Sequence, residues 1–477
     1  DEPALIRSVL GLRFDLNPHH FALPHFHFYF CYFFFQLLVK ARAVLRFLAL
    51  DGVTKSFFPL LWRDPSIFYL QMRLISAVMS AFAVVPIYLA AKQVFSRRVA
   101  LLSAAIYAFS HCSVKHAHFA LLEAPLLFWV GWVIYFSTLA LKESTWKNYL
   151  AAGFFTGIAT STKYTGVFSS LAIFSAAIFS GQRKFSDLKD KVFKLFGSAV
   201  ISVFAFLLGT PYFLLAWEEA FVPVGEEGYQ HGFLWQISRG GSYFDSQALQ
   251  RIWQAIVDFL PSLLGYVPLV LLLVSIFYLI FVSEAGVRKK GVKFLWFYPL
   301  ITFLFLASGE FREIHYFLPI IPSLAIISAV GGDFLLSTVK SYFAGKERLV
   351  LQIVLVVCFL AGSFFSSSKR AYVFSQTDTR QLARDWVLEN ISKNTIVGVD
   401  GGTQPILNEF ELVSIREWDS YLFKNKNMGA IIIAGKDLSR SDIQKGERQE
   451  VLEDYILAKK FEPDLKPGPS IFIFVQR

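Results

Sequence analysis

The chain has 477 residues, of which 55% are hydrophobic and only 17% charged, and its net charge is +10 at pH 7. Soluble domains carry more charge, so this composition excludes an ordinary soluble protein and predicts a helical protein that crosses a membrane many times. The positive charge fits basic loops beside a membrane better than nucleic-acid binding, for which the sequence shows no motif. The three cysteines lie in apolar segments and are typical of buried side chains, not of a disulfide framework or a metal site.

The first 73 residues form a long segment that begins with the acidic pair Asp1-Glu2. Its apolar stretch over 26–48 is interrupted by basic residues, and a single crossing there would reverse the side of every later loop. We therefore interpret 26–48 as a juxtamembrane or re-entrant element, with a two-way crossing that also uses 56–72 as the alternative. The chain starts with Asp instead of Met and shows no signal peptide, so we expect a segment upstream of it.

Apolar blocks follow from residue 74 to residue 368, separated by short charged loops. They predict ten spanning helices, over 74–94, 99–115, 124–141, 148–162, 165–181, 195–215, 259–283, 294–309, 317–337 and 349–367. From 369 to 477 the charge rises, and short β-rich runs such as Thr395–Val399 and Ala430–Ala434 alternate with helical ones. This last part predicts a small soluble α/β domain.

Lysine and arginine gather in alternate loops, which assigns the two sides of the membrane. The basic loops lie at Arg97-Arg98, 142–147, 183–194, 288–293 and 340–348. By the positive-inside rule these loops are cytoplasmic. The other loops, the first segment and the C-terminal domain are then expected outside the cytoplasm, in a plasma (inner) membrane.

The unusual ionisable residues fall mostly on this predicted outer side. Ionisable groups at a membrane edge are costly unless paired or hydrated, so they suggest function. Carboxylates can act as a general base or hold a divalent ion, and lysine, arginine and histidine can bind a phosphate. The candidates for catalysis are Asp1, Glu2 and Glu123, and the candidates for substrate or phosphate binding are His116, His118, Lys163, His231, Arg312 and Tyr316.

Most of these candidates also have an explanation that needs no substrate. His116 and His118 are two residues apart and do not share a helix face, so an interfacial role is slightly favoured for them. Glu123 stands at a predicted helix start, where an acid complements the helix dipole, and Lys163 can extend to the lipid headgroups. For the others, solvation or local pairing suffices: Asp1 and Glu2 as loop acids, and Arg312 with Glu310 or Glu313.

Several segments carry a resemblance when they are taken in order. The chain opens with DEPALIRSVLGLRFDLNPHHFALPHFHFYF, in which an acidic pair precedes the turn over 14–18. KHAHFALLEAPLLFW contains Glu123, YLAAGFFTGIATSTKYTG contains Lys163, and REIHYFLPIIPSLAI contains Tyr316. Over about residues 1–335 these segments resemble bacterial relatives of the protein O-mannosyltransferases and of the lipid A aminoarabinose transferases, within the C-type glycosyltransferase superfamily.

The resemblance implies a C-type glycosyltransferase fold, with one further spanning helix before Asp1. It implies an inverting transfer of a sugar from a polyprenyl-phosphate carrier to a protein, lipid or glycan acceptor. Asp1 would be the general base, Lys163 and Arg312 would stabilise the leaving phosphate, and Glu2 and Glu123 would shape the site or hold a cation.

A metal is left open by the resemblance. In the aminoarabinose transferases a Glu just before a Pro in the first loop helps to bind metal, and the comparable place here reads Ala22-Leu23-Pro24. His20 or His231 could substitute for that Glu, so a divalent cation stays undecided. Two other classes of function remain as alternatives: a transporter or flippase of polyprenyl-linked lipids, although the sequence shows no clear internal repeat, and a non-catalytic scaffold protein of the envelope.

Overall fold

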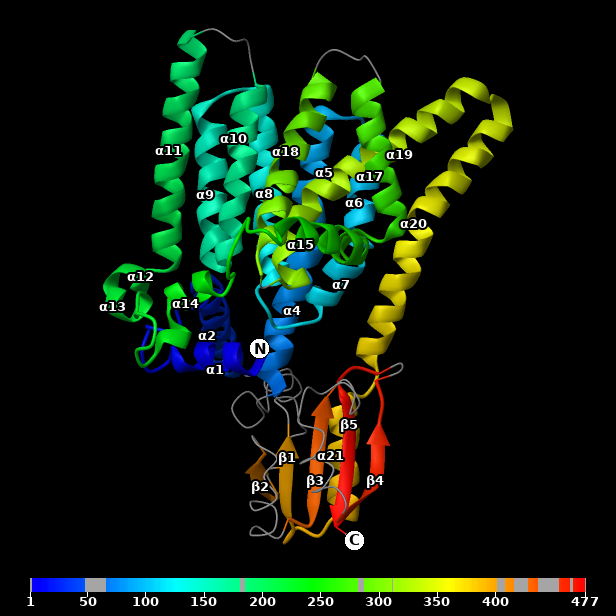
Figure 1. The fold of residues 1–477 in the computed structure, drawn as a ribbon. Coiled ribbons are helices and arrows are strands. Elements are labelled where there is room, and N and C mark those ends of the chain that lie inside the picture. The colour runs from blue at the N-terminus through cyan, green and yellow to red at the C-terminus, as the bar shows by residue number, and fades with distance from the viewer. Residues whose placement is uncertain are drawn as a thin grey trace. The chain divides into compact units, whose positions relative to one another are not determined.

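The chain folds as two compact units, Asp1–Ser367 and Ser368–Arg477 (Figure 1). The computed structural model describes residues 2–47, 66–180, 185–281, 287–310, 312–400, 407, 409–415, 428–435, 454–463 and 466–476. The catalytic candidate Asp1 and most of the alternative crossing over 56–72 lie outside these described residues.

The first unit is helical. Its longer elements in chain order are α1 (Glu2–Gly11), α2 (Phe26–Phe47), α4 (Ser66–Phe82), α5 (Val84–Val94), α6 (Arg97–Ala108), α7 (His111–Ala117), α8 (Glu123–Lys142), α9 (Trp146–Thr162), η1 (Tyr164–Ser169), α10 (Ser170–Phe179), α11 (Phe185–Gly209), α14 (Phe233–Ser238), α15 (Ala248–Gln254), α17 (Tyr266–Phe281), α18 (Val287–Ser308), η4 (Ile314–Ile320), α19 (Ile321–Tyr342) and α20 (Gly345–Ser375). Short helices connect them: α12 (Tyr212–Leu215), α13 (Trp217–Ala220), η2 (Tyr229–His231), η3 (Ala255–Phe259) and α16 (Leu260–Leu264).

The prediction of a mainly helical membrane protein is confirmed. Within the described residues, six helical segments are long and apolar enough to cross a membrane, or seven if one strongly bent pair counts as a single span. The six are Phe68–Val94, Glu123–Lys142, Leu188–Gly209, Lys290–Ser308, Ile314–Tyr342 and Gly345–Asn390. Three of the expected spans, over 99–115, 148–162 and 165–181, coincide with helices of fewer than 18 residues: α6 with α7, α9, and η1 with α10.

Two local features explain breaks inside expected spans. Ser110 adopts an extended conformation, and its hydroxyl accepts a hydrogen bond from the Ser113 N–H, which starts a new helix. Helix α6 therefore has 12 residues and rises only about 18 Å, well short of the roughly 30 Å hydrocarbon core of a bilayer. Gly265 has φ +86, and the chain bends by 112° between α16 and α17 in the expected span over 259–283.

Close contact between helices α9 and α11 depends on small residues. A Cβ atom on Gly153 would lie 2.3 Å from the Ser198 carbonyl oxygen, and one on Gly157 would lie 2.2 Å from the Ser202 carbonyl oxygen. This spacing of four residues places both glycines on one helix face, as in tightly packed membrane helices. The two helices run side by side in Figure 1, with α8 and α10 on the other side of α9.

The connection between α8 and α9 decides where two candidate residues meet. The helices are joined by a short turn and pack against each other, so the start of α8 and the end of α9 lie at the same end of the bundle. Beyond α9, Gly166 lets the chain fold back, since a Cβ there would lie 2.4 Å from the Ala159 backbone. Glu123 and Lys163 are therefore brought to one level.

The second unit contains a five-stranded mixed sheet in the order β2-β1-β3-β5-β4. The strands are β1 (Ile396–Asp400), β2 (Glu411–Ser414), β3 (Ala430–Gly435), β4 (Tyr455–Phe461) and β5 (Ser470–Gln476). Helix α21 (Thr379–Asn390) packs on one face through Ala383 and Val387, which belong to the same buried apolar cluster as Val397 and Ile473. The expected small α/β region is thus confirmed, with strands at both of the runs identified in the sequence.

Candidate active site

A cavity of about 420 Å³, here called the polar chamber, collects residues from five separate segments of the first unit. Its polar lining comes from Ser8, His20, Glu123, Lys163, Gln230, His231, Gln236, Arg239, Glu313, His315 and Tyr316. Four of the residues singled out in the sequence therefore share one cavity: Glu123, Lys163, His231 and Tyr316.

The centre of the chamber wall is a buried ion pair. Lys163 Nζ donates to Glu123 Oε1 at 2.7 Å, and each side chain is only 8% exposed. The ammonium of Lys163 also lies 5.4 Å from the centre of the Tyr316 ring, within cation–π distance. Buried ion pairs contribute little net stability compared with apolar packing, so their presence next to a cavity suggests a role in binding.

His116, on α7, does not line the chamber. It is 6% exposed, and neither ring nitrogen has a hydrogen-bond partner among the described residues. Burial lowers the pKa of His116 from its ordinary value to about 4, so the ring is neutral at pH 7. A neutral, enclosed imidazole is not a direct ligand for a phosphate in this arrangement.

Two histidines meet at the edge of the chamber. The Nδ1 atoms of His20 and His231 are 3.2 Å apart, and the Ala22 N–H donates to the His231 carbonyl oxygen at 2.6 Å. Burial, followed by the nearby His231 ring, lowers the pKa of His20 to about 4. Within the described residues, no group of three or more His, Cys, Asp or Glu side chains is arranged to hold a metal ion.

Arg239 provides the second cation of the chamber. Its guanidinium lies 5.0 Å from the centre of the Trp235 ring, one helical turn earlier, and 3.9 Å from Glu313 Oε1. The other oxygen of Glu313 lies 3.0 Å from His315 Nδ1. Arg239 is 38% exposed, whereas Lys163 is 8% exposed, so Arg239 is the more accessible of the two cations.

A second cavity of about 530 Å³, here called the aromatic groove, adjoins the chamber. The two cavities share Gln236, Arg239 and Tyr316. The rest of the groove is mainly apolar and includes Phe168, Phe206, Phe213, Phe221, Phe233, Tyr243 and Phe305. An arginine thus stands where a polar compartment passes into an apolar one, which suits an amphiphile with an anionic group between a polar part and a hydrocarbon tail.

Other candidates from the sequence lie outside the chamber lining. The Glu2 carboxylate binds both the Arg73 guanidinium, at 2.9 and 2.6 Å, and the Ala120 N–H, at 2.6 Å, so it fixes the start of α1 to neighbouring segments. His118 Nδ1 donates to the Val114 carbonyl oxygen at 2.7 Å, within its own helical turn.

Arg312, the expected phosphate ligand, points elsewhere. Its guanidinium donates to the Arg251 carbonyl oxygen and, at 3.0 Å, to Gln254 Oε1. Glu313, which the sequence offered as a partner for Arg312, lies against Arg239 and His315. The arginine on the chamber wall is Arg239, which the sequence reasoning did not select.

A signal for Arg239 exists in the sequence. The run Trp235-Gln236-Ile237-Ser238-Arg239 places an aromatic and a cation four residues apart in a loop predicted to be outside. An aromatic residue one turn from an arginine at a membrane edge is typical of a headgroup contact. The signal is short, and without the fold it does not distinguish Arg239 from Arg251 or Arg312.

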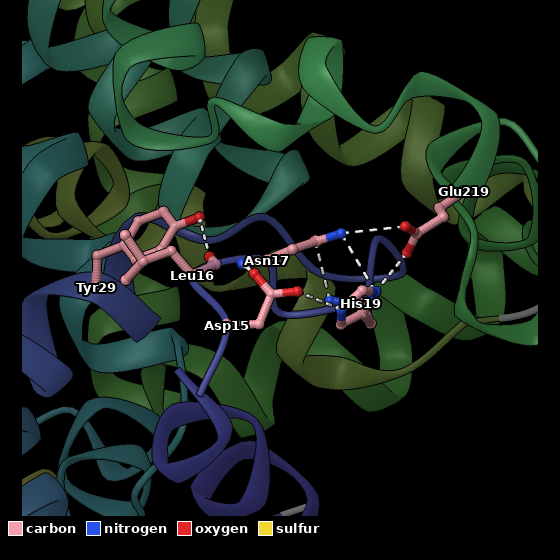
Figure 2. A network of polar contacts seen from close by, with 6 residues as sticks. All are labelled: Asp15, Leu16, Asn17, His19, Tyr29 and Glu219. Atoms are coloured by element: carbon pink, nitrogen blue, oxygen red, sulfur yellow. Dashed lines mark hydrogen bonds and ion pairs between the residues drawn. The ribbon is translucent and has the colours of Figure 1, made fainter. Parts of the chain in front are cut away.

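An exposed polar network joins the first segment to helix α13 (Figure 2). His19 Nδ1 lies 2.7 Å from Glu219 Oε2, and its Nε2 lies 3.0 Å from Asp15 Oδ2. Asn17 Nδ2 donates to Glu219 Oε1 at 3.1 Å, and the Asn17 side-chain oxygen accepts from the His19 N–H, which holds His19 at φ +50. The network fastens together two segments, 15–23 and 217–239, that both contribute to the chamber.

Comparison with known proteins gives a consistent family signal. Residues 68–208 match the family model described as dolichyl-phosphate-mannose-protein mannosyltransferase, and this stretch includes Glu123 and Lys163. Dolichyl-phosphate-mannose–protein mannosyltransferase 1 of Saccharomyces cerevisiae is 30% identical over 152 residues, which is 31% of this chain. The match spans only 18% of that relative's own length.

The fold is similar to that of a solved structure. ArnT from Cupriavidus metallidurans, in a crystal structure with undecaprenyl phosphate, superposes with a TM-score of 0.53 over 95% of this chain and 88% of that one. Sequence identity between the two is 11%, so this likeness concerns the fold. It agrees with the fold class expected from the sequence.

Proposed function

We propose that this chain is a C-type glycosyltransferase, which transfers a sugar from a polyprenyl-phosphate carrier to an acceptor nucleophile on the extracytoplasmic side of a membrane. The observation that carries the proposal is the position of Arg239 between the polar chamber and the aromatic groove. The isoprenoid tail would lie in the groove, the phosphate beside Arg239, and the sugar in the chamber.

The chamber offers a way to stabilise the leaving group. As the bond between the anomeric carbon and the phosphate oxygen breaks, negative charge develops on the phosphate. Arg239 and Lys163 are the two cations on the chamber wall within the described residues, and fixed cations at such a point lower the barrier. Gln236 and the rings of His20 and His231 would hold the sugar hydroxyls.

The general base is assigned by resemblance alone. Asp1 would remove the proton of the acceptor, whose oxygen or nitrogen then attacks the anomeric carbon from the side opposite the phosphate, so that the configuration inverts. Asp1 lies outside the described residues, but Ala4, Leu5 and Ser8 of the helix that follows it line the chamber. In Asp1→Asn we expect sugar transfer to be lost while binding of polyprenyl phosphate is retained.

A pair of arginine variants tests the site directly. Full-length protein in nanodiscs would be titrated with polyprenyl phosphate, comparing Arg239→Gln with the matched control Arg312→Gln. Loss of one charged contact weakens binding by about 1.5–3 kcal/mol, so Kd should rise roughly 10- to 150-fold in Arg239→Gln. Arg312→Gln should leave Kd nearly unchanged, and the reverse ranking would contradict the placement of the phosphate.

A further inference from the structure

We propose that His116 takes up a proton when a lipid phosphate binds in the polar chamber and that it then replaces Lys163 as the ionic partner of Glu123. The inference rests on the proposed function, because it concerns the same chamber. It adds a positioning residue and a coupling between substrate binding and protonation.

The charge of Lys163 is already neutralised by Glu123. Its ammonium is hydrogen-bonded to Glu123 at 2.7 Å, and both side chains are almost fully enclosed. The other cation, Arg239, lies 3.9 Å from Glu313. The charges of Lys163 and Arg239 are thus balanced by those of Glu123 and Glu313. An anion gains a full ionic contact with Lys163 only if the lysine turns away from Glu123.

A departure of Lys163 would leave Glu123 without its counter-ion. A buried carboxylate that loses its counter-ion is strongly disfavoured, because neither water nor another charge compensates it. Glu123 Oε1 would lose its partner, and Glu123 Oε2 has none among the described residues already. Partner exchange therefore needs a new positive charge close to Glu123.

His116 is the source of that charge. The His116 side chain is only 6% exposed. Both of its ring nitrogens lack a hydrogen-bond partner within the part of the chain that the structure describes. A positive charge on this ring would be attracted by Glu123 and repelled by Lys163, so it becomes more favourable when Lys163 moves away. Two buried ring nitrogens without hydrogen-bond partners are costly in free energy. This cost is explained if the ring forms an ionic contact with Glu123 when the ligand is bound.

The other titratable and charged groups around His116 come from several elements. Helix α8 presents Glu123, the end of α9 presents Lys163, and Lys115 lies next to His116 on α7. His315 is close to Glu313, and His27 Nε2 lies 3.4 Å from Cys31 Sγ. The other elements packed against α7 carry these titratable or charged side chains: Tyr69 and Arg73 on α4, Arg97, Arg98 and Tyr107 on α6, and none on α16.

The protonation step balances simply. Solvent supplies one proton to a His116 ring nitrogen, Lys163 passes from Glu123 to the phosphate, and the imidazolium takes its place beside Glu123. Binding of a singly charged phosphodiester is thereby accompanied by uptake of one proton. By linkage, affinity then falls as pH rises, by as much as tenfold per pH unit between the free-state and bound-state pKa values of His116.

The test counts protons. A farnesyl methyl phosphodiester is a suitable probe, because it keeps one negative charge across the neutral range. Its binding to full-length protein in nanodiscs would be followed by calorimetry at pH 7 in HEPES and in Tris, whose ionisation enthalpies differ. The dependence of the observed enthalpy on the buffer gives the number of protons taken up. We expect close to one for the wild-type protein and close to zero for His116→Gln.

His118→Gln is the matched control, since its ring is bonded to the Val114 carbonyl oxygen and lies outside the chamber lining. It should keep an uptake close to one, as should His315→Gln. Uptake that persists in His116→Gln, or that disappears only in His315→Gln, overturns the assignment. The wild-type measurement remains decisive even if His116→Gln does not fold. Binding without proton uptake would contradict this inference alone. No binding of the probe at all would contradict the proposed function as well.

Discussion

The ion pair in the chamber wall and the exposed network at His19 differ in almost every physical respect, although both join segments far apart in the sequence. Glu123 and Lys163 are 8% exposed and 40 residues apart. His19 is 57% exposed and Glu219 is 46% exposed, with 200 residues between them. The first contact is enclosed and has one carboxylate oxygen to spare, whereas the second is open to solvent and divided over several hydrogen bonds.

The two contacts stabilise the same site in different ways, one through exposed charges and the other through a buried ion pair. Exposed charges are screened, so the His19 network adds little stability and mainly orients the 15–23 and 217–239 segments. A buried pair depends strongly on both partners, because either charge alone is very unfavourable in a low-dielectric interior. We therefore expect the buried pair to dominate both stability and lipid-phosphate binding, with the exposed network setting only the local order of the rim.

The largest effect is expected from removing half of the buried pair. Glu123→Gln leaves Lys163 without a counter-ion and should destabilise the protein by about 3–5 kcal/mol, seen as a clear drop in melting temperature. In the double variant Glu123→Gln with Lys163→Met, the buried charge is gone, and most of the stability should return.

Function should not return with stability in that double variant. The chamber would then have lost one of its cations, so binding of polyprenyl phosphate and sugar transfer should both stay impaired. If the double variant is as unstable as Glu123→Gln, the loss of stability does not come from the unpaired charge of Lys163. Full activity in the double variant would remove Lys163 from the phosphate site.

An intermediate effect is expected at a partly buried hydrogen bond between neutral groups. The Tyr164 hydroxyl donates to the Phe21 carbonyl oxygen at 2.8 Å and links the end of α9 to the first segment. Tyr164→Phe removes one such bond while keeping the ring, so it should cost about 1 kcal/mol in stability by thermal unfolding. A loss as large as that of Glu123→Gln would erase the distinction between ionic and neutral contacts at this site.

The helical fold could be predicted from composition because apolar blocks and basic loops are local signals. Interruptions such as those at Ser110 and Gly265 were missed, since one polar or flexible residue in an apolar run hardly changes its hydropathy. Glu123 and Lys163 could be selected because each is an ionisable group at the end of an apolar helix. Their meeting was not predictable, because it depends on how α8 and α9 pack.

Arg239 and Arg312 show the limit more sharply. Both lie in loops on the predicted outer side, and the sequence favoured Arg312 because of its resemblance to a family motif. The difference between them is tertiary: Arg312 is bound to the carbonyl oxygen of Arg251 and to Gln254, while Arg239 stands on Trp235 at the junction of two cavities. The distribution of charge predicts one side of the membrane for both loops, whereas the convergence of particular loop residues on one cavity requires the fold.

The smallest effect is expected at the exposed network, and it should depend on pH. Hydrogen bonding to Glu219 raises the pKa of His19 above its ordinary value. A group whose pKa is raised on folding stabilises the folded state fully below its unfolded pKa, about 6.5, and this contribution is lost as pH rises through the folded value. The link between segments 15–23 and 217–239 should therefore loosen on the alkaline side of pH 6.5.

On the acidic side the sign is opposite. Hydrogen bonding to the Asn17 N–H, followed by that to His19, lowers the pKa of Asp15, so its contribution is lost only as pH falls toward the pKa of a carboxyl group. Hydrogen exchange of residues 217–231, corrected for the intrinsic rate, should thus show a modest loss of protection between pH 6 and pH 9. In Glu219→Gln the main cause of the raised His19 pKa is absent, so protection should be lower and nearly independent of pH over this range. An unchanged pH response in that variant would place the titrating group elsewhere.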